Sequence, residues 1–95
     1  MKQIEINNHY KVLRVEIPAG KDVPRHYATF DAFIMVNSGN ALLIFSDETI
    51  ELKKDSYFSI TANRPHTLRI VEDFKAWIVL ANDAEIKYPN INRLH

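Results

Sequence analysis

The most constraining feature of this 95-residue chain is a succession of short apolar runs, separated by turn residues at a spacing of about ten residues. Within each run, apolar and polar residues tend to alternate, which is the period of a strand with one buried face. No segment carries the sustained apolar repeat of an amphipathic helix. We therefore expect an all-β protein of about seven to nine strands. The runs are 11–17, 32–36, 41–45, 49–52, 57–60, 67–71 and 74–81.

Only two glycines punctuate these runs, Gly20 and Gly39. Glycine adopts positive φ without a steric penalty, so we expect both to lie in tight turns that delimit one structural unit. The polar stretches 37–40 and 72–73 are expected to end strands. The polar segment 82–95 is expected to be irregular.

Length and composition restrict the functional class. A chain this short forms one domain, residues 1–95. Twelve basic residues balance twelve acidic ones, which predicts no general attraction to nucleic acid or to a membrane surface. The absence of cysteine excludes disulfides and thiolate sites. No secretory signal is visible at the N-terminus, so a cytoplasmic location is expected.

Placed on this strand pattern, the glycine spacing resembles the first motif of the cupin family. That motif runs glycine, five residues, His-x-His, three or four residues, Glu, six residues and glycine. Gly20, His26 and Gly39 match it at the expected positions. Ala28 replaces the second histidine and Ala32 replaces the glutamate.

The second cupin motif is matched more sparsely. His66 stands at its histidine, whereas Asp55 and Asn63 stand at its two glycines. Asparagine tolerates the left-handed backbone that a glycine would adopt there. The resemblance covers about residues 11–81 and implies a cupin-type double-stranded β-helix, a jelly-roll barrel of two antiparallel sheets. Residues 82–95 would form its C-terminal tail.

The resemblance also implies a site inside the barrel, where three histidines and a glutamate hold a metal ion. This chain retains His26 and His66, so the resemblance implies at most a weakly bound divalent metal (Zn, Ni, Mn or Fe) and no firmly predicted cofactor. A third ligand would have to come from outside the motif, for example from Asp31, from Tyr27 or from His95 of a neighbouring subunit. Asp31 lies one residue from the glutamate position, which places it on the opposite face of a strand.

The candidate ligand-binding residues are His26, His66, Tyr27, Ala28 and Ala32. The two histidines either contact a ligand or are simply satisfied by the backbone. The two alanines either leave room for an organic molecule or are packed over by large side chains. Arginines beside the histidines are candidates for attracting an anion. The side chains available for packing are Tyr57, Phe58, Phe74 and Trp77, and the arginines are Arg25 and Arg64.

These residues favour a small-molecule-binding cupin barrel with a degenerate metal site, serving as a ligand-binding or sensory module. The alternatives are a metal-dependent cupin enzyme, isomerase- or dioxygenase-like, and a structural or interaction protein. No residue can be assigned a catalytic role, and enzymatic activity stays open. Phe33 and Met35 alternate with inward positions and should face outward, which favours a homodimer.

Overall fold

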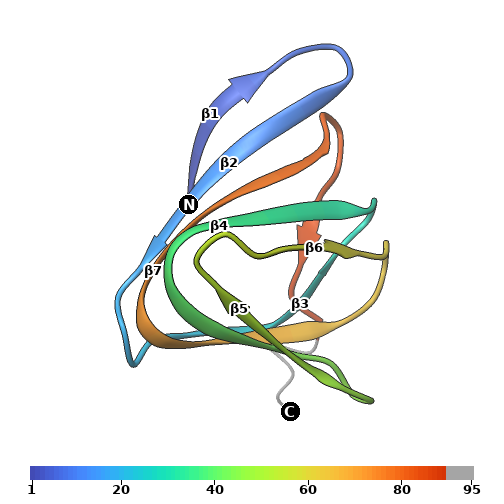
Figure 1. Cartoon of the computed structure of the whole chain (residues 1–95). Helices are drawn as coiled ribbons and strands as arrows, with labels where there is room; N and C mark the ends of the chain where they lie inside the picture. Colours follow the sequence, from blue (N-terminus) through green and yellow to red (C-terminus); the bar gives the residue numbers. More distant parts are fainter. Residues whose placement is uncertain (90–95) are drawn as a thin grey trace.

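The structure, a computed structural model, describes residues 1–89 and contains strands as its only regular elements in that range (Figure 1). This confirms the all-β expectation. Because no helix is present in residues 1–89, none there is long and apolar enough to cross a membrane. The strands are β1 (Lys2–Ile6), β2 (Tyr10–Ile17), β3 (Asp22–Ala28), β4 (Ala32–Ile44), β5 (Thr49–Lys53), β6 (Tyr57–Ile60), β7 (His66–Ala81) and β8 (Ile86–Lys87).

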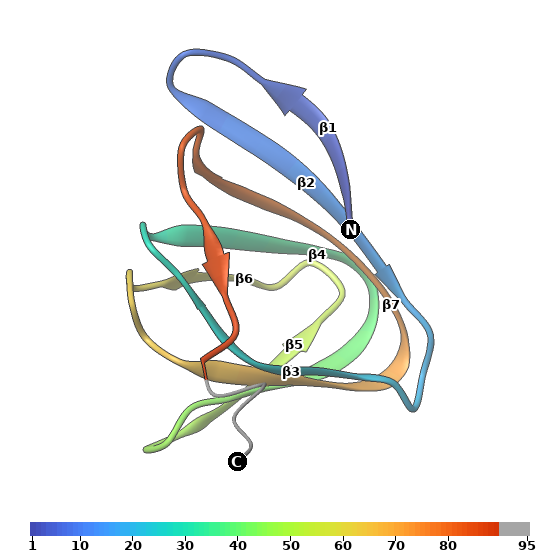
Figure 2. The same cartoon turned by 180° about the vertical axis from the view of Figure 1, so that it is seen from behind.

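Two long strands, β4 and β7, run through both layers of the barrel (Figures 1 and 2). The second half of β7 pairs with β2 and with the first half of β4, which also pairs with β6. The first half of β7 pairs with β3 and with the second half of β4, which also pairs with β5. The strand orders are therefore β1-β2-β7-β4-β6 and β8-β3-β7-β4-β5, and all pairs are antiparallel.

The expectation that residues 37–40 and 72–73 end strands is wrong, because the chain bends at both places without leaving the sheet. The β4–β7 register shifts between Val36 and Ala41, as at β-bulges. Gly39 has φ of 89° inside β4. A Cβ atom there would lie 2.8 Å from the Phe74 Cα atom and closer still to the Asp73 carbonyl oxygen. Gly39 therefore permits close contact between two strands, whereas Gly20, with φ of 87°, lies in the expected turn.

Three strands carried no usable sequence signal. Every residue of β1 is exposed, so this strand has no buried face to produce an apolar alternation. Strand β3 contains Pro24, which lies where the register with β7 shifts, a position that tolerates proline. Strand β8 has two residues and lies within the segment expected to be irregular, where it pairs with β3.

The inward alternation of β4 is as predicted. Ala32, Ile34 and Val36 are buried, whereas Phe33 and Met35 are exposed. Asp55 and Asn63, at the two glycine positions of the second motif, adopt φ of 71° and 62°. The backbone has thus kept the left-handed conformation although the glycines are gone. Of the four aromatic residues suggested for packing, Phe74 is buried and Phe58 packs against the core, whereas Tyr57 and Trp77 are exposed.

Candidate functional site

The pairing of β3 with β7 brings the two predicted histidines together. His26 and His66 are partners in the antiparallel register. Their ring centroids are 4.3 Å apart, with an angle of 66° between the ring planes. His66 is buried and His26 is half-buried. The two imidazole rings therefore lie next to each other.

Both imidazoles are held by the same local hydrogen bond. The Nδ1 atom of His26 lies 2.7 Å from the carbonyl oxygen of Pro24, and Nδ1 of His66 lies 2.8 Å from the carbonyl oxygen of Arg64. A carbonyl oxygen only accepts hydrogen bonds, so in each ring Nδ1 carries the proton and donates it. In the neutral ring, Nε2 is then an acceptor with a free lone pair.

Burial keeps both rings neutral. It lowers the pKa of His26 below its usual value, against the opposing effect of the hydrogen bond to Pro24. It lowers the pKa of His66 to about 4, against the opposing effect of the hydrogen bond to the carbonyl group of Arg64. At neutral pH each of the two rings therefore has one lone pair, at Nε2, and no imidazolium charge.

Each ring of the histidine pair also contacts an aromatic ring. The Tyr88 ring lies 5.4 Å from His26, and the Phe45 ring lies 5.7 Å from His66. Phe45 in turn contacts Phe58 at 6.0 Å. The row draws on residues from five separate parts of the chain, and it gives the two nitrogens a largely apolar surround.

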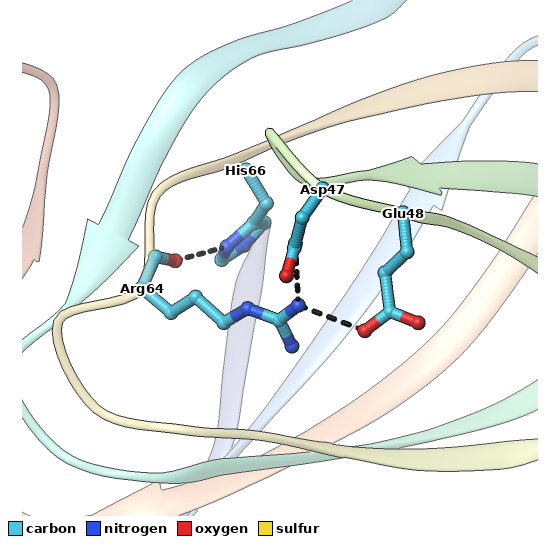
Figure 3. Close-up of polar contacts among 4 residues, drawn as sticks. All are labelled: Asp47, Glu48, Arg64 and His66. Carbon is cyan, nitrogen blue, oxygen red and sulfur yellow. Dashed lines mark hydrogen bonds and ion pairs between the residues drawn. The ribbon is translucent and has the colours of Figure 1, made fainter.

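Arg64 anchors the segment that carries His66 (Figure 3). Its Nη2 atom lies 3.0 Å from Asp47 and 2.8 Å from Glu48, both in the turn between β4 and β5. Its guanidinium carbon lies 3.6 Å from the centre of the Phe45 ring. The suggestion that Arg64 attracts an anionic ligand is therefore wrong, because two carboxylates already neutralise its charge.

Sequence comparison agrees with this architecture. Residues 13–81 match the sequence profile of the cupin domain. The chain belongs to the cupin family. No curated protein matches it.

Solved cupin structures share the fold at low sequence identity. A cupin-2 domain protein from Shewanella frigidimarina aligns with a TM-score of 0.72 at 22% identity, over 82% of this chain and 74% of that one. An RmlC-like cupin from Desulfovibrio desulfuricans aligns with a TM-score of 0.73 at 20% identity, over 85% of this chain and 79% of that one. DMSP lyase from Ruegeria pomeroyi aligns with a TM-score of 0.82 at 16% identity, over 93% of this chain and 47% of that one. The TM-scores establish the shared fold, and at such low identity they leave the activity open.

The other predicted site residues of this cupin are distributed differently. Tyr27 follows His26 on β3, where side chains alternate between faces, and it pairs with Lys87 of β8. Ala28 pairs with Ile86 and packs against the core. Ala32 is 7% exposed and belongs to the core. The methyl groups that stand at the missing ligand positions are thus next to packed apolar side chains.

One candidate for the third metal ligand, Asp31, makes a different contact. Asp31 is exposed, and its carboxylate accepts a hydrogen bond from the Ala62 amide at 2.8 Å. No cluster of three or more His, Cys, Asp or Glu side chains in that range is arranged to hold a metal ion. His95 lies outside the described residues. A complete metal centre needs three or four converging ligands, so the described residues do not fit one.

Sequence reasoning missed Tyr88 and the anchoring role of Arg64. Tyr88 lies in the tail, 62 positions along the chain from the ring it contacts, and no motif marks it. The partners of Arg64 are 16 and 17 residues away in another turn. Such contacts depend on the register of the barrel, which no local pattern reveals.

Proposed function

We propose that this cupin is a small-molecule-binding module, in which the Nε2 atoms of His26 and His66 contact the ligand. The observation that carries the proposal is the pair of Nδ1–H bonds to backbone carbonyls, beside a ring separation of 4.3 Å. Two neutral acceptors held side by side are suited to a ligand that presents hydroxyl or amine donors. The flanking ring of Tyr88 offers such a ligand an apolar surface to stack against.

The test uses untagged protein. Elemental analysis establishes whether metal is bound, and thermal shift is measured against divalent metals and against a library of sugars and small acids. We expect no stoichiometric metal and stabilisation by at least one organic compound. A ligand at a hundred times its Kd stabilises the fold by about 2.7 kcal/mol.

Matched variants locate the binding. His26→Ala and His66→Ala should abolish the shift, whereas His9→Ala should leave it intact, because His9 is exposed in the turn between β1 and β2. Retention of the full shift in both site variants would refute the proposal.

A metal-dependent enzyme is the second candidate, of isomerase or dioxygenase type. It is favoured by the Nδ1–H bonds to carbonyl groups, since histidines that bind metals usually donate their second ring nitrogen in this way. It requires a third ligand beyond residues 1–89 or from another subunit. Stoichiometric metal that is lost in His66→Ala would favour this candidate over the binding module.

We also propose that the chain forms a homodimer through the outer face of the β2-β7-β4-β6 layer. Phe33, Met35, Tyr57 and Trp77 are exposed on these strands. Met35 is the register partner of both Tyr57 and Trp77, and the rings of Phe33 and Tyr57 are 5.9 Å apart. A continuous apolar surface of this kind is stabilised by burial against a second copy.

A further inference from the structure

The two histidines of the site differ in how their carbonyl partners are held. The acceptor for His26 is the carbonyl of Pro24, which lies within β3 and has its φ fixed by the proline ring. The acceptor for His66 belongs to Arg64, which lies in the loop between β6 and β7. No strand pairing fixes the position of this second carbonyl. Its place depends on what holds the loop.

The side chain of Arg64 ties the loop to the turn between β4 and β5. The guanidinium group donates to Asp47 at 3.0 Å and to Glu48 at 2.8 Å, and it lies over the Phe45 ring. The same Phe45 ring contacts the imidazole of His66 edge-on. Two additional contacts hold the start of the loop: the Ala62 amide donates to the Asp31 carboxylate at 2.8 Å, and the Asn63 amide donates to the Ala28 carbonyl oxygen of β3 at 2.8 Å. Arg64 therefore connects the carbonyl group that His66 uses to the turn between β4 and β5 (Figure 3).

We propose that Arg64 is a positioning residue, whose clamp on Asp47, Glu48 and Phe45 keeps His66 in the Nδ1–H tautomer with its Nε2 lone pair available. The tautomer of a neutral histidine is set by the hydrogen bond that the other ring nitrogen makes. Loss of the clamp frees the loop, lengthens the bond from Nδ1 to the carbonyl, and lets the proton exchange between the two nitrogens. The Nε2 atom then becomes a donor for part of the time.

This inference rests on the proposed function for its importance, since His66 needs a lone pair at Nε2 to receive a ligand. Its test needs no ligand. Two-dimensional NMR of ¹⁵N-labelled protein at pH 7.5 reports which imidazole nitrogen carries the proton. The wild type should show a single Nδ1–H tautomer for both His26 and His66.

Two routes to an opened clamp are compared. Arg64→Gln removes the guanidinium group, and the double variant Asp47→Asn/Glu48→Gln keeps Arg64 but removes its charged partners. Both should lose the single-tautomer signature at His66 and keep it at His26. Arg69→Gln is the matched control, because Arg69 is an exposed arginine of β7 that pairs with Asp22 at 3.9 Å. It should change neither ring.

The outcomes separate the two proposals. If His66 keeps a pure Nδ1–H tautomer in both clamp variants, Arg64 is not a positioning residue, whatever the ligand-binding experiments show. If Arg64→Gln fails to fold, the double variant decides the question by the same spectrum. If His26 loses its tautomer together with His66, the effect is a general loosening of the barrel and the proposal is overturned. Failure of every ligand to bind would refute the proposed function and leave the tautomer result standing.

Discussion

Replacement of Gly39 by alanine tests the idea that β4 and β7 bend around a point of backbone contact. A Cβ atom at this position would meet the main chain of Asp73 and Phe74, which cannot rotate away as a side chain would. Gly20 is a close control, because its φ of 87° nearly equals the 89° of Gly39, while a Cβ atom there meets nothing within 4 Å. The two variants share the conformational cost and differ in the steric cost.

The expected magnitudes follow from these two costs. A residue with a Cβ atom loses about 1–2 kcal/mol in the left-handed region, and Gly20→Ala should lose this amount. Separating the strands to admit a methyl group adds about 1–3 kcal/mol, so Gly39→Ala should lose about 2–5 kcal/mol. A domain of this size has a free energy of unfolding of about 5–14 kcal/mol. The second variant should therefore lose a large share of its stability.

Equilibrium unfolding in urea measures both values. Trp77 is the only tryptophan and lies on β7, so its fluorescence reports the loss of this strand. The midpoints should fall in the order wild type, Gly20→Ala, Gly39→Ala, with similar slopes. Equal destabilisation of the two variants would show that backbone contact at the bend carries no cost of its own.

Three further predictions concern the site and the outer face. The pKa of His66 is about 4 in the folded protein, against an ordinary value of 6.5 that applies to the unfolded chain. The unfolded chain therefore binds the proton more tightly, so wild-type stability should fall relative to that of His66→Gln by up to about 3 kcal/mol between pH 6.5 and pH 4. Urea unfolding of both proteins at pH 7.5 and pH 4 measures this difference. No difference between the two proteins across this range would contradict it. Met35→Lys should convert a dimer into a monomer in sedimentation analysis, and it should lower the melting temperature at concentrations where the wild type is dimeric. An unchanged mass argues against the proposed interface. Ala28→His/Ala32→Glu should restore the missing ligands and tighten Zn²⁺ binding in calorimetry by at least about tenfold, or 1.4 kcal/mol, and affinity equal to that of the wild type would show that the two alanines do not stand at ligand positions.

Local patterning predicted the strands that have one buried face. The alternation of Ile34 and Val36 with Phe33 and Met35 is a direct consequence of burial on one side, and it needs no knowledge of partners. The bends were not predictable in the same way. A polar stretch such as 37–40 looks like a turn, and only the proximity of Asp73 shows that the chain continues in the sheet.

The same distinction applies to the site. His26 and His66 could be found because the motif spacing preserves two of the motif's histidines even where its other two site residues are alanine. Tyr88 and the clamp on Arg64 could not be found, because each depends on a tertiary contact between segments with no shared local signal. Asp31 shows that a position near a motif residue does not by itself identify a metal ligand. Its carboxylate instead accepts a hydrogen bond from the loop between β6 and β7.

The central position of β7 has a consequence for how the chain is made. Within residues 1–89, strand β3, which carries His26, pairs with β7 and β8 alone, and both follow it in the sequence. While the ribosome is still adding residues 66–81, β3 therefore lacks its strand partners, and its edges stay open to other chains. The histidine site is assembled last, from pairings distant in sequence, which are slow to form. Chaperone demand during translation should accordingly be greatest just before β7 emerges.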